Sequence, residues 1–169
     1  MEEKHGYFLD DLSVGMSGVY AKTVTDADIV MFAGISGDTN PVHLDELFAD
    51  QTRFKGRIAH GMLSASFIST VLGTRLPGPG CVYCSQTLKF RAPVKAGDTV
   101  TARVTIRDID QDKKRVTFST VCSVADTVVI DGEATLLVDR RAEVLEPAGD
   151  RAGNGQGEFR PESGISAAE

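Results

Sequence analysis

The chain has 169 residues and a formal net charge of −6, with 41% hydrophobic and 25% charged residues. This length fits one domain better than two, and the composition favours a folded body over a disordered chain. Nucleic-acid-binding proteins usually carry clustered Lys and Arg to neutralise phosphates, and the sequence has no such cluster. Apolar runs stay below the ~18 residues of a membrane span, and residues 1–10 lack the apolar stretch of a secretory signal. We therefore expect a cytoplasmic protein without a nucleic-acid or membrane partner.

The first part of the chain predicts a strand followed by helices. Residues 19–24 partly alternate between apolar and polar side chains, which favours a strand. Thr25 is a favourable N-cap for a helix that runs to about residue 35, and Gly37 is placed to end it. A short helix is predicted over residues 44–49. Its inward-facing side chains would be Leu44, Leu47 and Phe48.

An uncharged helix and a run of strands make up the second part. Residues 61–73 carry no formal charge and are apolar on most sides, which is typical of a helix in the middle of a fold. Four segments rich in β-branched residues follow, separated by turn residues. One long helix beside antiparallel strands predicts an α+β fold with the sheet wrapped around the helix. The four predicted strands are 82–91, 99–108, 115–124 and 127–138.

The composition shifts to Gly, Ala, Glu, Arg and Pro near residue 146. We therefore expect one domain over residues 1–145 and a flexible C-terminal tail over residues 146–169. Within the domain, Cys81 and Cys84 have the C-x-x-C spacing of some redox and zinc sites. Residues three apart in a strand face opposite ways, and no second pair completes a zinc site. A structural role is the stronger interpretation.

Asp38 and His43 are the first candidates for chemistry. They lie five residues apart, separated by a rigid turn that contains Asn40 and Pro41. Such a turn can bring the carboxylate and the imidazole to one water molecule, and either group can move a proton near neutral pH. The alternative is that Asp38 only forms the turn and His43 only begins a helix. Spacing alone favours this alternative.

His60 and Gly61 form the second candidate element, at the start of the uncharged helix. The first N–H groups of a helix have no internal partner and carry partial positive charge. A glycine there lets a ligand oxygen approach the backbone and be stabilised as it gains negative charge. The alternative is that Gly61 only allows close packing between helix and sheet. The two interpretations are about equally strong.

Together these elements resemble a known family. The string Asp38-Thr39-Asn40-Pro41-Val42-His43, followed by His60-Gly61-Met62, resembles the hydratase 2 motif of MaoC-like dehydratases. The likeness is greatest to the short (R)-specific enoyl-CoA hydratases and covers roughly residues 10–138. It implies a hot dog fold, a homodimer with acyl-CoA in a tunnel near the subunit interface, and no cofactor or metal.

The resemblance also implies a role for individual residues. Asp38 and His43 would hold and activate the water, and the Gly61 N–H would polarise the thioester carbonyl. Ser69, within the long helix, would help position the catalytic groups. The residues expected beside the substrate are Asn40, which also shapes the catalytic loop, and His60.

The implied reaction is the reversible hydration of a trans-2-enoyl-CoA to the (R)-3-hydroxyacyl-CoA. A dehydratase acting on acyl-carrier-protein thioesters, a hot dog thioesterase and a non-catalytic acyl-CoA-binding module are the alternatives. The Asp-x-Asn-Pro-x-His loop before the helix favours a hydratase over a thioesterase, and a binding module predicts the loss of Asp38 or His43. Basic residues that could meet the phosphates of CoA are Lys55, Arg57, Lys89, Arg91 and Lys95.

Overall fold

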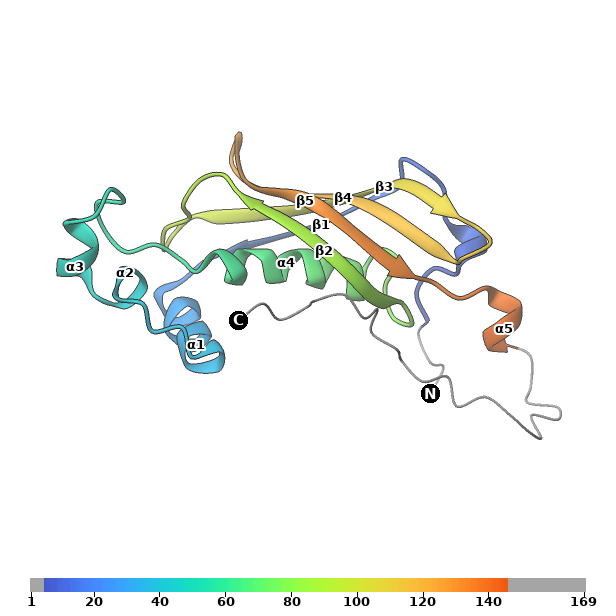
Figure 1. Cartoon of the computed structure of the whole chain (residues 1–169), viewed down its shortest axis with the longest axis horizontal. Coiled ribbons are helices and arrows are strands. Elements are labelled where there is room, and N and C mark those ends of the chain that lie inside the picture. The colour runs from blue at the N-terminus through green and yellow to red at the C-terminus, as the bar shows by residue number, and fades with distance from the viewer. Residues whose placement is uncertain (1–4, 146–169) are drawn as a thin grey trace, which may run out of the picture.

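The computed structural model describes residues 5–145, in which a five-stranded antiparallel sheet lies over one long helix (Figure 1). The strand order is β1-β3-β4-β5-β2, so the first two strands of the chain form the two edges. The predicted α+β layering is confirmed, whereas the predicted tail lies outside the described residues. The strands are β1 (Ser17–Thr23), β2 (Val82–Phe90), β3 (Thr99–Asp110), β4 (Arg115–Val124) and β5 (Thr127–Leu137).

The long helix α4 (Gly61–Thr74) packs against the inner face of the sheet. Its buried side chains, among them Phe67 and Ile68, meet the inward-facing side chains of β3, among them Val104 and Ile106. Full burial of one such side chain stabilises the fold by ~1.5–3 kcal/mol, so this contact holds α4 in place against the sheet. The position of its first residue, Gly61, is held with it. Although α4 is apolar, no helix within residues 5–145 is long and apolar enough to cross a membrane.

Three short helices continue from β1 and lie beyond the N-terminal end of α4 (Figure 1): α1 (Asp26–Ser36), α2 (Pro41–Leu44) and α3 (Glu46–Asp50). The predicted caps of α1 are confirmed. The Thr25 hydroxyl accepts the Asp28 N–H, and Gly37 ends the helix with a left-handed φ of 76°. Because the chain turns sharply at Gly37, the residues after it are brought back toward the start of α4.

The predicted burial of the second short helix was wrong. Leu44 is 36%, Leu47 80% and Phe48 47% exposed. The predicted helix is divided between two: Leu44 is the last residue of α2, and Leu47 and Phe48 lie on α3, which buries Ala49 instead. Each of these helices is only about one turn long and presents a narrow face to the core, so the three large side chains do not share one inward face.

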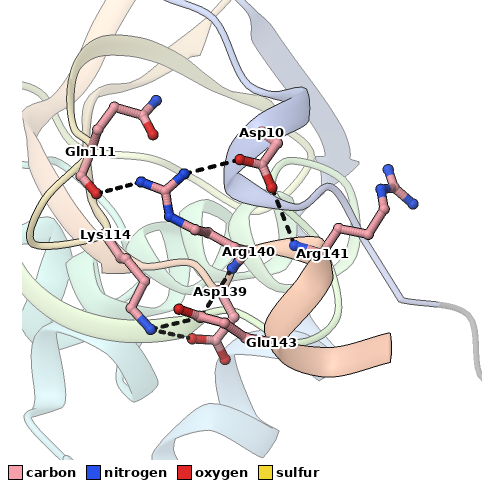
Figure 2. A network of polar contacts seen from close by, with 7 residues as sticks. All are labelled: Asp10, Gln111, Lys114, Asp139, Arg140, Arg141 and Glu143. Atoms are coloured by element: carbon pink, nitrogen blue, oxygen red, sulfur yellow. Dashed lines mark hydrogen bonds and ion pairs between the residues drawn. The ribbon is translucent and has the colours of Figure 1, made fainter. Parts of the chain in front are cut away.

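A polar network secures the opposite end of the sheet (Figure 2). Arg140 donates to Asp10 Oδ1 at 3.1 Å and to the Gln111 carbonyl oxygen at 2.9 Å, which ties the start of the chain to the β3–β4 turn. Lys114 donates to two carboxylates at 3.2 and 2.8 Å, beside the short helix α5 (Arg141–Leu145) that the sequence does not predict. Those carboxylates belong to Asp139 and Glu143.

The three cysteines are free thiols. Cys84 is exposed at an irregularity in the pairing of β2 with β5, and Cys81 is half-buried. Burial raises the pKa of the Cys81 thiol, and it raises the pKa of the Cys122 thiol to about 12. These two thiols stay protonated near neutral pH, which favours a structural role over a redox role.

The cap of α1 generates a pH-dependent prediction. Hydrogen bonds from the Lys22 ammonium, then from the Thr25 N–H and hydroxyl, lower the pKa of Asp28 from 3.8 to about 2. A carboxyl group with a lowered pKa stabilises the folded state above its unfolded pKa, and this contribution is lost as the pH falls toward 2. We expect Asp28→Asn to lower the free energy of unfolding by about 1 kcal/mol at neutral pH, and by less near pH 3.

Urea denaturation at both pH values measures this difference. The control is Asp126→Asn in the exposed β4–β5 turn, which should have little effect at either pH. A loss of stability in Asp28→Asn that is the same at both pH values would contradict the assignment.

Candidate active site

A cavity of about 710 Å³ opens where the N-terminal end of α4 meets the α2–α3 segment and the end of β2. Its volume lies in the range of small-molecule sites, ~300–1,000 Å³. Apolar side chains such as Ile58, Phe90 and Ile130 form part of the wall. The residues of the wall with polar side chains or a free helix N–H are Asp38, His43, Arg53, His60, Gly61, Ser64 and Arg91.

His43 is held in one orientation by the backbone. Its Nδ1 lies 2.8 Å from the carbonyl oxygen of Ile58, and the side chain is 8% exposed. A carbonyl oxygen can only accept a hydrogen bond, so Nδ1 must carry the hydrogen. In the neutral ring, Nε2 is therefore a hydrogen-bond acceptor. The Asn40 side chain caps α2 by accepting the Val42 N–H at 3.2 Å, which fixes the turn that carries His43.

His60 is held in the opposite tautomer. Its Nε2 lies 2.9 Å from the carbonyl oxygen of Asp38, so Nε2 is the donor and Nδ1 the acceptor of the neutral ring. The side chain is 2% exposed, and its Nδ1 has no hydrogen-bond partner within residues 5–145. The His43 and His60 ring centroids are 3.8 Å apart, with the planes tilted by 31°. The two rings thus restrain each other.

Asp38 directly follows the left-handed Gly37 and is exposed. Its Oδ1 accepts the Asn40 N–H at 3.2 Å, which orients the carboxylate within the turn. One polar atom from each of Asp38, His43 and His60 lies within 4.8 Å of the other two. The structure therefore brings the carboxylate and the imidazole to a separation at which one water molecule can bridge them.

Gly61 is the first residue of α4, and its N–H therefore has no partner within the helix. It also lines the cavity. A Cβ atom at this position would lie 2.6 Å from the Phe90 ring, so a larger residue does not fit. Both interpretations of Gly61 are compatible with this geometry, because the close contact with β2 and the free N–H coexist.

The structure does not bring Ser69 or Asn40 to the cavity wall. Ser69 is exposed on α4, and Asn40 acts through the turn as a cap. The serine of α4 that does line the cavity is Ser64, which is 1% exposed and whose hydroxyl has no partner in the described part of the chain. Five residues along a helix correspond to ~7.5 Å and a rotation of ~140°, so Ser69 faces elsewhere. The spacing of four residues from His60 was the available signal for Ser64.

The basic residues near the cavity differ in whether they line its wall and in whether their charge is already paired. Arg91 lines the wall but donates twice to Asp131, at 2.8 and 3.0 Å. Arg57 donates to the His43 carbonyl oxygen at 2.8 Å and therefore supports α2. Arg53 also lines the cavity, with its guanidinium 5.1 Å from the centre of the Phe54 ring, and was missed in the sequence. The other candidates for CoA phosphates, which do not line the wall, are Lys55, Lys89 and Lys95.

Comparison with known proteins adds four findings. The family model of the MaoC-like domain matches residues 15–129. An (R)-specific enoyl-CoA hydratase from Rhodospirillum rubrum is 58% identical over 80% of this chain and 94% of its own length. A 3-hydroxybutyryl-CoA dehydratase from Methylorubrum extorquens is 48% identical over 88% of this chain and 94% of its own. The solved structure of an R-hydratase from Pseudomonas aeruginosa in the unliganded form superimposes with a TM-score of 0.76 at 41% identity, covering 80% of this chain and 87% of that chain.

The two carbonyl contacts predict the tautomers of both histidines. In the neutral form of each ring, His43 should carry its hydrogen on Nδ1 and His60 on Nε2. Long-range ¹H–¹⁵N correlation NMR of histidine-labelled protein distinguishes the two forms. His5, which lies outside the cavity, provides the reference signal. A hydrogen on Nε2 of His43 would contradict the geometry.

Proposed function

Because the chain belongs to the MaoC-like domain family, we propose that it reversibly hydrates a trans-2-enoyl-CoA to the (R)-3-hydroxyacyl-CoA. It has the hot dog fold of its structural neighbours, as the sequence predicted. The observation that carries the proposal is the convergence of the Asp38 carboxylate and the His43 imidazole beside the first N–H of α4. An acid/base pair and an oxyanion donor are the two elements that addition of water to an enoyl thioester needs.

The proposed reaction begins with a water molecule between Asp38 and His43. One of the two groups takes a proton from the water as its oxygen bonds to Cβ, and His43 Nε2 is oriented as an acceptor for that proton. The electron pair of the Cα–Cβ double bond moves toward the thioester carbonyl oxygen. The Gly61 N–H, at the positive end of the α4 dipole, stabilises the charge on that oxygen. A proton from the same pair then returns to Cα, which leaves the enzyme unchanged.

His60 and Asn40 act in this scheme by positioning Asp38. The His60 ring donates to the Asp38 carbonyl oxygen, and the Asn40 N–H donates to the Asp38 carboxylate. Both therefore hold the turn that carries the carboxylate. The positioning role expected for Ser69 stays a prediction that the geometry of a single chain does not support.

CoA thioesters are the proposed substrates rather than carrier-protein thioesters, because the relatives from Rhodospirillum rubrum and Methylorubrum extorquens, 58% and 48% identical, are both named for CoA substrates. Arg53 places positive charge on the cavity wall, which suits an anionic ligand, whereas the charge of Arg91 is paired with Asp131. A thioesterase, the alternative reaction, would need the water to attack the carbonyl carbon and not Cβ. The cytoplasmic location stays a prediction from the sequence.

We propose a homodimer formed through the β2 edge of the sheet. An edge strand with exposed large apolar side chains needs a partner, and Val82, Tyr83 and Phe90 on β2 are 55%, 40% and 54% exposed. Phe90 also lines the cavity, so the second copy would border the substrate. Light scattering should give the mass of two chains, and a monomer at micromolar concentration would contradict this assembly.

Loss of either member of the acid/base pair should abolish most of the activity. We expect Asp38→Asn and His43→Gln each to slow the hydration of crotonyl-CoA by about two orders of magnitude, because each removes a proton-transfer group. The loss of the enoyl thioester absorbance measures the rate, and thermal unfolding checks that each variant is folded. His5→Gln and Asp126→Asn, which lie outside the cavity, are the matched controls. A near-normal rate in either site variant would refute the proposed pair.

A further inference from the structure

The helix that carries His43 cannot hold its own shape. α2 has only four residues, Pro41–Leu44, and isolated helices of this length are not stable in water. A bond from the Asp45 N–H to the Pro41 carbonyl oxygen, at 2.8 Å, closes its turn. The carbonyl groups that follow have no partner within so short a helix. The direction of the His43 side chain therefore depends on partners from elsewhere in the chain.

Residues 57 and 58 supply these partners. The Arg57 Nε–H donates to the His43 carbonyl oxygen at 2.8 Å, and the Ile58 N–H donates to the Val42 carbonyl oxygen at 3.3 Å. The Ile58 carbonyl oxygen accepts the hydrogen of His43 Nδ1. His43 is thus held at its ring and at its own carbonyl group by two adjacent residues. Of these contacts, the one from Arg57 is made by a side chain, so a substitution can remove it without changing the backbone.

Arg57 also reaches α1. Its Nη2 lies 3.2 Å from Oδ1 of Asp26, in the first turn of that helix. The side chains of Asp26 and Arg57 are 70% and 22% exposed, so this ion pair is partly solvated and contributes little to stability by itself. It does restrain the guanidinium, which is planar, so that a contact at Nη2 also sets the direction of the Nε–H. Arg57 therefore connects α1 to the backbone of His43.

The sequence offers Arg57 as a partner for the phosphates of CoA, and the structure favours a different role. Among the described residues, Arg57 is not part of the cavity wall, and both arms of its guanidinium are already engaged. We propose that Arg57 is a positioning residue for the hydration, which holds His43 so that its Nε2 stays aimed at the water, and that it does not bind the substrate. The effect on the rate rests on the proposed function.

The Arg57→Lys variant separates the two roles. Lysine keeps the positive charge that a phosphate needs, but its single ammonium group does not reproduce the two-armed contact. We expect kcat for crotonyl-CoA to fall about 10-fold while KM changes less than about 2-fold, because a misplaced His43 slows the chemical step. Arg103→Lys, an exposed position on β3 outside the cavity, is the control and should change neither value. A raised KM with an unchanged kcat, or no change in either, would overturn the proposal.

A double-mutant cycle tests the link to α1. Asp26→Asn should lower kcat roughly 2-fold in the wild-type chain, because it removes a partly solvated ion pair. In the Arg57→Gln background, where no ion pair remains to be lost, the same substitution should have no further effect. An equal loss in both backgrounds would overturn the connection through Arg57.

The orientation of His43 is also read without turnover. In ¹H–¹⁵N correlation spectra, Arg57→Gln should move the ring signals of His43 toward those of a mixture of tautomers, while those of His60 stay in place. Unchanged His43 signals in the folded variant would overturn the positioning role, whatever the rate. A chain that hydrates no enoyl thioester, but in which Arg57→Gln shifts the His43 signals as expected, would overturn the proposed function and leave the positioning of His43 standing.

Discussion

Two backbone carbonyl groups determine what the cavity can do. The Ile58 carbonyl fixes the hydrogen of His43 on Nδ1, and the Asp38 carbonyl fixes the hydrogen of His60 on Nε2. If the His43 ring were free to turn, its lone pair would not be aimed, and proton transfer would not be favoured by the fold. Holding the rings in this way costs little free energy, because the Ile58 and Asp38 carbonyl groups lie outside the strands of the sheet and have no strand partner to give up.

The position of these carbonyls depends in turn on the sheet and on α4. Burial of the apolar face of α4 against β3 sets the place of Gly61 and therefore of His60. The left-handed turn at Gly37 then returns the chain to the His60 ring, where the Asp38 carbonyl accepts its hydrogen bond. A stable core thus holds a site whose own polar groups are incompletely satisfied, since Nδ1 of His60 and the hydroxyl of Ser64 have no partner within residues 5–145.

Local signals in the sequence predicted much of this arrangement. The caps of α1 at Thr25 and Gly37, the strands and the central helix follow from short-range patterns, and the structure confirms them. The burial of Leu47 was predicted wrongly because a helix period does not reveal which face meets the core. Likewise, α4 is apolar on most sides, so its hydrophobic pattern does not tell which serine faces the cavity, and only the spacing of Ser64 from His60 points to it. The tautomers of the two histidines depend on carbonyl groups 15 and 22 residues away, which no local pattern encodes.

The account rests on a water molecule that adds to Cβ of an enoyl thioester and not to its carbonyl carbon. Incubation of the protein with crotonyl-CoA in H₂¹⁸O, followed by mass spectrometry and chiral analysis of the products, tests this claim most directly. We predict one ¹⁸O atom on C3 of an intact (R)-3-hydroxybutyryl-CoA. Label in a free carboxylate, together with release of free CoA thiol, would contradict the account and identify a thioesterase.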